Sequence, residues 1–290
     1  MTRPRERGRG WEHMSSLKGK VALCTGSGRP GGLGESILAR LAREGCRVVV
    51  SDLGQPPAGL EATNLASSED AERVAAGLRA AGAEVLAVPL DVRDEAQVEA
   101  AVARAVEEFG RLDILVNNAG IGFLMEPLLE TSREHWQTVL DVNLMGAFLC
   151  TKHAARQMIH QGQGGRIVNV ASQAAKSGHA HMAAYTASKH GMVGLTRSAA
   201  MELGPYGITV NAVCPNHVTT GLGSAQNEYF ARLRGFASVE EYLADMRRRI
   251  PLRRTGLPND TAEAVAFLCS DAAEYVTGEA MNVSGGIEMH

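Results

Sequence analysis

Residues 21–34 read VALCTGSGRPGGLG, a short apolar run that leads directly into a turn with five glycines. The run Val21–Thr25 predicts a buried strand, and the pattern Glu35–Glu44 predicts a helix after the turn. Glycines let backbone amides approach a pyrophosphate closely, and the N-terminus of the next helix supplies partial positive charge. The stretch therefore predicts a nucleotide-binding turn. A merely flexible loop is the alternative, which the position between strand and helix disfavours.

The rest of the sequence alternates short apolar runs with longer helical patterns. Further strands are predicted at Arg47–Ser51, Glu84–Pro89, Ile114–Asn117, Arg166–Ala171, Ile208–Val213 and Ala280–Val283. Further helices are predicted at Glu69–Ala81, Glu95–Phe109, Glu134–His160, Ala183–Leu203 and Thr261–Cys269. Strands that are apolar throughout are typical of burial on both faces. We therefore expect an α/β protein with a doubly wound parallel sheet of the Rossmann type and helices on both faces.

Neither an internal repeat nor a linker divides the sequence, so residues 15–290 are expected to form a single dinucleotide-binding and catalytic domain. Residues 221–257 interrupt the alternation and carry two helical patterns, Glu228–Leu233 and Val239–Arg249. Long insertions of this kind often cover a site, so a helical lid is predicted there. The spacing Thr131-x-x-Glu134 further predicts a capping box at the start of the fourth helix.

The first 14 residues differ from the rest because they are rich in arginine and contain no apolar core, which excludes a secretory signal. Glu6 and Glu12 weaken the interpretation as a transit peptide. A disordered basic tail is expected, with Met14 as an alternative start.

Composition narrows the class of protein further. The 290 residues are 45% hydrophobic and carry a net charge of −3, which gives no reason to expect nucleic acid or an anionic membrane as a partner. No apolar run approaches the ~20 residues of a membrane span, and no residue cluster predicts a metal site. The five cysteines are scattered without a Cys-x-x-Cys pair, which favours a reducing compartment such as the cytoplasm.

The motif Tyr185-x-x-x-Lys189 places a phenol and an ammonium on one face of a predicted helix. A phenol titrates near pH ~10, and a neighbouring ammonium favours its anion and lowers that pKa. The pair therefore predicts a proton shuttle, although the same spacing also arises by chance on helix surfaces.

Asp52 ends the second predicted strand. A carboxylate there can accept hydrogen bonds from both ribose hydroxyls of an adenosine and would repel a 2′-phosphate, which favours NAD over NADP. Arg29 in the glycine turn is the counter-argument, because a basic residue there could hold that phosphate.

Together these motifs resemble the short-chain dehydrogenase/reductase family, in its single-domain branch, from about Leu17 to the C-terminus. The signatures stand in the expected order: the glycine turn, Asp91-Val92, Asn117-Asn118-Ala119-Gly120, Asn143, Ser172 and Tyr185-x-x-x-Lys189. Each motif is weak alone, but the set is highly specific.

The resemblance implies a four-residue catalytic site. Tyr185 would exchange a proton with the substrate oxygen, and Lys189 would lower its pKa and hold the nicotinamide ribose. Ser172 would hydrogen-bond the substrate oxygen, and Asn143 would hold a water that links Lys189 to solvent. Alternatively, Ser172 could simply end a strand, and Asn143 could be a helix residue whose side chain bonds to the backbone. Ser188, inside the Tyr–Lys motif, is expected to have a structural role.

The resemblance also implies the cofactor contacts. Asn117, Ala119 and Gly120 would line the adenosine side, Asp91 and Val92 would flank the adenine, and Pro215, Val218 and Thr220 would meet the nicotinamide. The full predicted set is Gly26, Gly28, Arg29, Gly32, Leu33, Gly34, Asp52, Leu53, Asp91, Val92, Asn118, Ala119, Gly120, Tyr185, Lys189, Pro215, Val218 and Thr220.

The sequence departs from the family pattern in the glycine turn, which is two residues longer than usual because of Arg29-Pro30-Gly31. Divergent enoyl reductases also have longer turns, but their Tyr–Lys spacing is longer too, which argues against that branch. Asn216 replaces the usual glycine after the sixth strand and tolerates a positive φ better than most residues. Ser284 stands where Asp is common.

The predicted activity is hydride transfer between NAD(H) and a secondary alcohol or ketone. The expected pocket walls are rather polar: Gln173, His179, His181, His217, Gln226 and Asn227. They favour a polyol, sugar or hydroxy acid. An anionic substrate is a further possibility because of the arginines in Arg247–Arg249 and Arg253–Arg254. The favoured interpretation of these arginines is an exposed helix face. Alternatives are an NADP-dependent carbonyl reductase, a non-catalytic nucleotide-sensing relative, or a structural protein. The resemblance implies a homodimer or homotetramer through the long helices.

Overall fold

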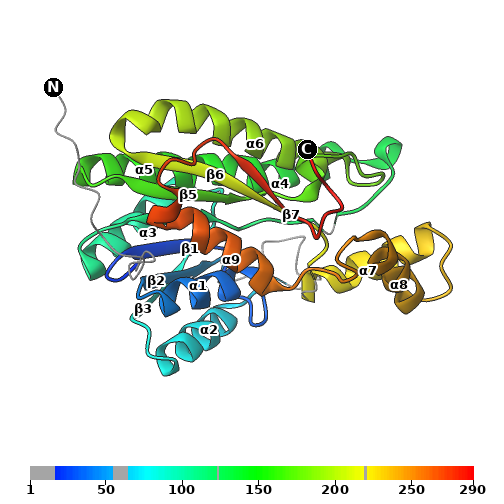
Figure 1. The fold of residues 1–290 in the computed structure, drawn as a ribbon, viewed down its shortest axis with the longest axis horizontal. Coiled ribbons are helices and arrows are strands. Elements are labelled where there is room, and N and C mark those ends of the chain that lie inside the picture. Colours follow the sequence, from blue (N-terminus) through cyan, green and yellow to red (C-terminus); the bar gives the residue numbers. More distant parts are fainter. Residues whose placement is uncertain (1–16, 55–64, 123, 219–220) are drawn as a thin grey trace.

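A computed structural model describes residues 17–54, 65–122, 124–218 and 221–290. The described part of the chain contains one seven-stranded sheet with the order β3-β2-β1-β4-β5-β6-β7, and every pair of neighbours is parallel (Figure 1). The strands are β1 Val21–Thr25, β2 Arg47–Asp52, β3 Val85–Pro89, β4 Ile114–Asn117, β5 Gly165–Val170, β6 Ile208–Pro215 and β7 Ala280–Val283. The predicted parallel sheet is therefore confirmed, with strand ends shifted by no more than two residues.

Helices cover both faces of this sheet. They are α1 Leu33–Arg43, α2 Ser68–Ala80, α3 Glu95–Phe109, α4 Arg133–Leu140, α5 Gly146–Gln161, α6 Ala183–Leu203, α7 Gly221–Leu233, α8 Val239–Arg249 and α9 Pro258–Cys269. Short 3-10 turns lie at η1 Leu128–Glu130, η3 Gln173–Ala175, η4 Gly204–Tyr206 and η5 Asp271–Ala273. None of the described helices is long and apolar enough to cross a membrane.

Alternate residues of each strand face opposite layers, as the two-residue period of a strand requires. In β1, Ala22 and Cys24 pack with α1, α2 and α9, whereas Val21 and Leu23 pack with α3, α5 and α6. Both layers are apolar, which explains why the strands read as continuous hydrophobic runs. The chain order reverses between β1 and β4, so the carboxyl ends of these two strands flank the crevice where ligands bind in open α/β sheets.

The fourth predicted helix is not continuous. A π-helical turn, η2 (Asp141–Met145), separates α4 from α5. Such turns often occur at functional sites. The predicted capping box was also wrong, because Ser132 rather than Thr131 caps α4 by accepting a hydrogen bond from the amide of His135. The Thr131 hydroxyl instead donates to the carbonyl of Pro127.

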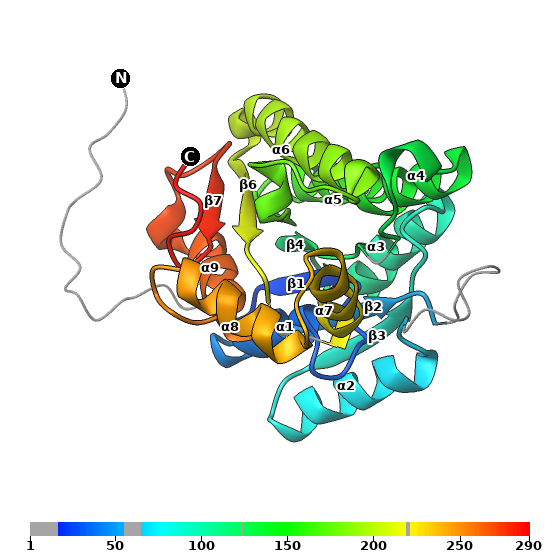
Figure 2. The same ribbon diagram turned by 90° about the vertical axis from the view of Figure 1, so that its right-hand side faces the viewer.

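The pair α7–α8 lies beyond the carboxyl ends of the strands, in front of the sheet in the view of Figure 2. The two helices pack on each other through Ala231, Tyr242, Met246 and Ile250, a small core of their own. Helix α7 begins at Gly221, well before the predicted Glu228, whereas α8 has the predicted bounds. The predicted basic tail lies outside the described residues.

Candidate active site and nucleotide-binding cleft

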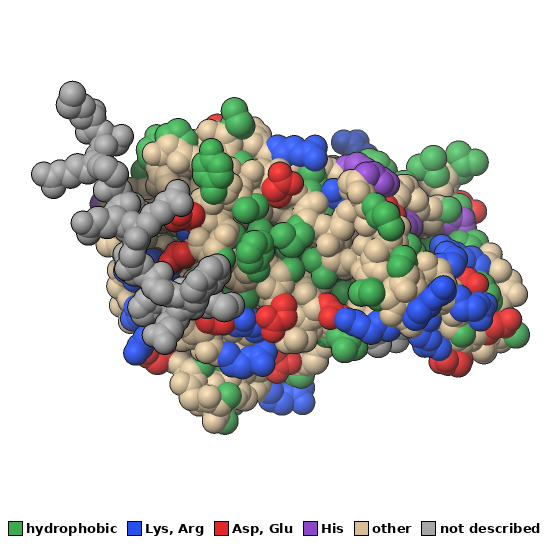
Figure 3. Space-filling model, in the orientation of Figure 1, with side chains coloured by type: hydrophobic (Ala, Val, Ile, Leu, Met, Phe, Trp, Pro, Cys, Tyr) green, Lys and Arg blue, Asp and Glu red, His purple; other side chains and the backbone are tan. Residues whose placement is uncertain are grey.

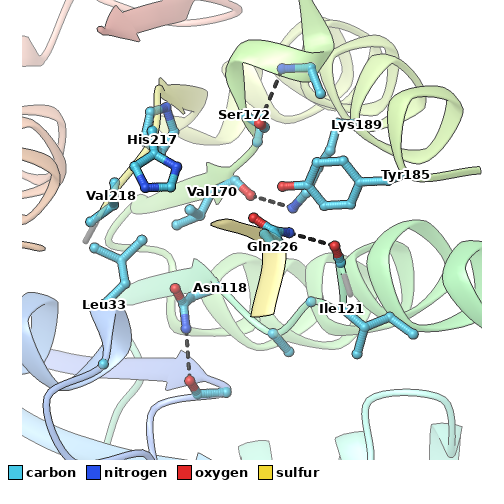
Figure 4. A pocket seen from close by; sticks show the side chains of 18 of the residues that line it. Leu33, Asn118, Ile121, Val170, Ser172, Tyr185, Lys189, His217, Val218 and Gln226 are labelled. Carbon is cyan, nitrogen blue, oxygen red and sulfur yellow. Dashed lines mark hydrogen bonds between the residues drawn. The ribbon is translucent and has the colours of Figure 1, made fainter. Parts of the chain in front are cut away.

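A cavity of about 410 Å³ lies between the carboxyl end of the sheet and the α7–α8 pair (Figure 4). At one end it is lined by the glycine turn and the loops after β2, β3 and β4. At the other end it is lined by the loop after β5, the start of α6, the loop after β6 and the α7–α8 pair. The predicted catalytic residues Ser172, Tyr185 and Lys189 all line it.

The glycine turn is packed too closely to carry side chains at Gly26, Gly28, Gly32 and Gly34. A Cβ on Gly26, which has φ of +63°, would lie 2.7 Å from Ala119 Cα, and a Cβ on Gly34 would lie 2.6 Å from Ser27 Cα. The Asn118 amide ties the turn to the loop after β4 by donating to the carbonyls of Thr25 and Gly26. The turn is thereby held as a fixed backbone cradle.

The insertion that lengthens the turn lies on its outside, where Pro30 and Gly31 are exposed, and it leaves this cradle in place. The Gly32 amide donates to the carbonyl of Arg29 at 3.0 Å, and the exposed Gly31 amide donates to the Glu35 carboxylate at 2.6 Å. Of the turn residues predicted to bind the cofactor, Gly26, Arg29, Gly32 and Leu33 line the cavity. Gly28 and Gly34 do not line it; they allow close packing behind the turn.

Asp52 and Leu53 line the cavity directly beside the turn. The Asp52 carboxylate accepts hydrogen bonds from the amides of Gly28 at 2.8 Å and Leu53 at 2.9 Å. Burial raises the pKa of Asp52, while the two amides and the charge of Arg29 oppose that rise. A carboxylate held in this way presents a fixed acceptor to the cavity.

The loop after β3 adds Asp91, Val92 and Arg93 to the same end of the cavity. The Arg93 side chain donates to the Asp91 carboxylate from Nε at 2.9 Å and from Nη2 at 2.6 Å. Burial alone would raise the pKa of Asp91, but the hydrogen bonds and the charge of Arg93 outweigh it and lower the pKa. Arg93 was not singled out from the sequence; its position two residues after Asp91 was the available signal.

Asn118, Ala119 and Gly120 line the cavity, whereas Asn117, which was expected on the adenosine side, does not. The Asn117 side chain is buried beneath α5 and donates to the Thr151 hydroxyl at 3.0 Å and to Asn169 Oδ1 at 2.8 Å. Adjacent residues of an extended chain point to opposite sides, so Asn117 faces the core where Asn118 faces the turn.

Tyr185 and Ser172 meet at the end of the cavity opposite the glycine turn (Figure 4). Burial raises the pKa of the Tyr185 phenol, and its hydrogen bond with Ser172 offsets only part of that rise. The Lys189 Nζ lies 5.6 Å from the centre of the Tyr185 ring and donates to the carbonyl of Val170 at 2.8 Å. The sequence predicted a lowered pKa for this phenol. The protein's own groups raise it instead, because the effect of burial is the largest.

Burial also lowers the pKa of the Lys189 ammonium to about 8. The residue is 4% exposed and lines the cavity. Lys189 is thus a cation held out of water beside the phenol, where its charge acts with little screening.

Asn143 lies in the π-helical turn, fully buried and outside the cavity lining. Its Oδ1 accepts from the Ile121 amide at 2.8 Å, and its Nδ2 donates to the Ile121 carbonyl and to the Ser188 hydroxyl, both at 3.0 Å. Ser188 in turn donates to the carbonyl of Tyr185 at 2.7 Å. This chain connects the loop after β4 to the base of α6; a water held by Asn143 stays a prediction.

The loop after β6 presents buried polar atoms without protein partners. Pro215, Asn216, His217 and Val218 line the cavity, and neither Asn216 Nδ2 nor His217 Nε2 has a hydrogen-bond partner in the described part of the chain. Burial lowers the pKa of His217. Such atoms need a partner from a ligand or water. They fit the carboxamide of a nicotinamide, as the cradle at the other end fits a pyrophosphate; predicted Thr220 lies outside the described residues.

The C-terminal residues close one wall of the cavity. Gln173 Nε2 donates to the Glu288 carboxylate at 2.9 Å, and the Ser177 hydroxyl donates to it at 2.5 Å. Ile287 beside it lines the cavity. The tail is thereby fixed to the loop that carries Ser172, a contact that no local sequence signal indicated.

Most arginines of the predicted basic ranges lie on the outer face of the α7–α8 pair and the loop after it (Figure 3). Arg247 pairs with Glu240, Arg248 with Asp245, and Arg254 with Asp260. Arg249 is the exception in these ranges, because it lines the cavity. Arg234, which the sequence did not single out, lines it as well.

The chain is similar to known proteins over most of its length. A protein family described as enoyl-(acyl carrier protein) reductase matches residues 26–288. A short-chain dehydrogenase/reductase of Armillaria gallica is 40% identical over 273 residues, which cover 94% of this chain and 97% of the relative. The 3-oxoacyl-(acyl-carrier-protein) reductase FabG of Staphylococcus aureus is 38% identical over 93% of this chain and 98% of its own. The crystal structure of an NAD⁺-bound xylitol dehydrogenase superposes with a TM-score of 0.84 at 34% identity, covering 93% of this chain and 99% of that one.

Proposed function

Because the chain belongs to the short-chain dehydrogenase/reductase family, we propose that it transfers a hydride between NAD(H) and a secondary alcohol or ketone. One observation carries the proposal: Tyr185, Ser172 and Lys189 meet at one end of a single cavity whose other end is the glycine turn with Asp52. Residues 15–290 would then act as one domain, with the α7–α8 pair as its lid.

The chemistry follows from the positions of three side chains. A bound nicotinamide would supply or accept the hydride. As an alcohol is oxidised, its hydroxyl proton passes to Tyr185 Oη, and in reduction the same atom returns it to the forming alkoxide. The Ser172 hydroxyl donates to the substrate oxygen where negative charge develops. Lys189 stabilises the phenolate form of Tyr185, because its ammonium is buried beside the ring.

We further propose NAD as the cofactor. The Asp52 carboxylate is fixed by two backbone amides at the adenosine end of the cavity, where it would accept bonds from ribose hydroxyls and repel a 2′-phosphate. The NAD⁺-bound xylitol dehydrogenase supports this, since it aligns over nearly the whole chain. Arg29 beside Asp52 favours the second candidate, an NADP-dependent carbonyl reductase, which the 3-oxoacyl-(acyl-carrier-protein) reductase relative also supports.

The substrate end of the cavity favours a polar molecule such as a polyol, sugar or hydroxy acid, because Gln173, His179, His217, Gln226 and Asn227 line it. Xylitol, the polyol in the name of one structural relative, is of this kind.

Assembly and location are also proposals. Exposed apolar side chains on the π-turn, α5 and α6, namely Met145, Phe148 and Met201, support a homodimer or homotetramer through these helices. The five cysteines are all free and buried, which supports a reducing compartment such as the cytoplasm.

The test is the absorbance of reduced nicotinamide during incubation with secondary alcohols, polyols and hydroxy acids, each with NAD and with NADP. Turnover with NAD, and a cofactor preference that Asp52→Asn lowers about tenfold, are the expected results. The matched control is Asp271→Asn, an exposed carboxylate remote from the cavity. A preference for NADP in the unmodified protein would contradict the cofactor assignment, and cofactor binding without any turnover would contradict the enzyme assignment.

A further inference from the structure

One face of α7 lines the cavity with three side chains at helical spacing: Asn227, Phe230 and Arg234. Arg234 directly follows the last helical residue, and its amide still donates to the carbonyl of Phe230 at 3.0 Å. Residues three or four positions apart share one side of a helix. The three side chains therefore form a continuous stripe, which we call the α7 stripe.

The start of the α7 stripe lies next to the reacting groups. Gln226 Nε2, beside Asn227, donates to the carbonyl of Gly122. A Cβ on Gly122 would lie 3.0 Å from Tyr185 Cε2 and 3.1 Å from Gln226 Nε2, so these two side chains are close neighbours. Arg234 lies eight residues after Gln226, which is roughly 12 Å along the helix at 1.5 Å per residue. The stripe thus runs from the catalytic tyrosine to a guanidinium some distance away.

The charge of the cavity differs between its two ends. Its lining carboxylates, Asp52 and Asp91, both lie at the nucleotide end. The other end is lined by Arg234, Arg249, His179 and His217, and by no carboxylate among the described residues. Glu288 lies behind this wall, where Gln173 and Ser177 hold its carboxylate.

Arg234 is the guanidinium at this end that has no carboxylate partner. Arg249 is paired with Asp245 at 2.9 Å, whereas Arg234 forms no ion pair within the described part of the chain. Its guanidinium carbon lies 5.9 Å from the centre of the Phe230 ring and 5.6 Å from that of Tyr242. Two aromatic rings hold the group in place and leave its donors available to an anion.

Asn227 gives a second, independent indication of a polar ligand. The residue is 8% exposed, lines the cavity, and its Oδ1 has no hydrogen-bond partner among the described residues. A buried acceptor left without a partner is costly, so a ligand donor such as a hydroxyl is expected to lie against it.

We propose, on the premise of the hydride transfer above, that the substrate carries a carboxylate several carbons away from its reacting carbon, and that Arg234 binds this carboxylate. One unpaired guanidinium offers one positive charge in a planar fork, which matches a single carboxylate. The length of the α7 stripe places the carboxylate far from Tyr185, which selects longer hydroxy or oxo acids over the shortest ones.

The test uses methyl-ketone acids of increasing length, from acetoacetate and levulinate to homologues with four and five methylene groups between the ketone and the carboxylate. Each acid is paired with its methyl ester, which removes the charge. Binding to the protein–NADH complex is measured by calorimetry, and reduction by the loss of NADH absorbance. We expect the longer acids to bind about tenfold or more tightly than their esters, and acetoacetate to show little such preference.

Arg234→Met should abolish the preference for the longer acids over their esters. The affinity for NADH and the binding of the esters should stay unchanged. Arg232→Met is the matched control, because it removes the same charge from an exposed position of α7 outside the cavity lining. Equal binding of acids and esters, or an acid preference that survives Arg234→Met, overturns the proposal. If acetoacetate shows the same Arg234-dependent preference over its ester, the proposed distance between the reacting carbon and the carboxylate is wrong. Tight, Arg234-dependent binding of acids without any reduction would instead count against the hydride transfer alone.

Discussion

The two ends of the cavity recognise their ligands by different means. At the nucleotide end, the backbone itself is the binding surface, and a single Cβ on Gly26 or Gly34 would collide with neighbouring backbone. At the substrate end, long side chains such as Arg234 project from the α7–α8 pair, whose core is separate from that of the sheet. Recognition by backbone tolerates few residue types, whereas recognition by side chains can change with single substitutions. The first end therefore tolerates little change, whereas the second can vary with the ligand that it binds.

The largest expected effect comes from Tyr185, at the substrate end of the cavity. Tyr185→Phe removes the hydroxyl that exchanges the proton and should lower kcat by about a thousandfold, while the affinity for the cofactor changes little. Steady-state kinetics and fluorescence titration with NADH measure the two quantities. Tyr275→Phe, at a fully exposed phenol, is the control and should leave both unchanged. A Tyr185→Phe protein with near-normal turnover would break the assignment of the reaction to this end of α6.

A smaller effect should distinguish the glycine cradle from ordinary helix positions. Gly34 and Gly77 both lie within helices, but a Cβ on Gly34 would meet Ser27 Cα at 2.6 Å, whereas one on Gly77 would meet nothing within 4 Å. Gly34→Ala should weaken NADH binding about tenfold and destabilise the protein by about 1–3 kcal/mol. Gly77→Ala should leave binding intact and stabilise the helix by about 0.5–1 kcal/mol. Thermal unfolding and NADH titration measure both; equal behaviour of the two variants would refute a backbone cradle.

The smallest predicted effect is a pH dependence of stability due to Lys189. Burial lowers its pKa from 10.5 to about 8, so above pH about 8 the unfolded chain binds this proton more strongly than the folded protein does. The free energy of unfolding should therefore rise between pH about 8 and about 9.5, by about 1–2 kcal/mol relative to a Lys189→Met protein. Urea unfolding of both proteins across this range measures the difference. A difference that stays flat, or falls with pH, would show that Lys189 is not buried as the structure has it.

The sequence was most informative where local patterns determine structure. The apolar strands and the glycine turn were predicted nearly to the residue, because a strand buried on both faces can be neither long nor polar. Asn143 was found by its motif, but the π-helical turn around it was not. That turn depends on hydrogen bonds to Ile121 and Ser188, which lie more than twenty residues away in the chain.

The α7–α8 end of the cavity shows why the rest could not be predicted. Arg234 faces the cavity because Phe230 and Tyr242 hold it there, and those contacts depend on how α7 packs against α8. The raised pKa of Tyr185 likewise follows from burial by the whole assembly of elements, not from its neighbour at Lys189. Local spacing can identify the groups that react, but their electrostatic surroundings come from contacts distant in the sequence.

The tail held by Gln173 and Ser177 has a practical consequence for the design of expression tags. A tag fused after His290 would start a few residues from Glu288, beside the loop that carries Ser172. Residues 17–20 precede β1 at the amino end of the strands, opposite the cavity, since all seven strands run parallel and the cavity is at their carboxyl ends. A tag after His290 is therefore expected to disturb the substrate wall, and kinetic constants are best measured on a protein that ends at His290.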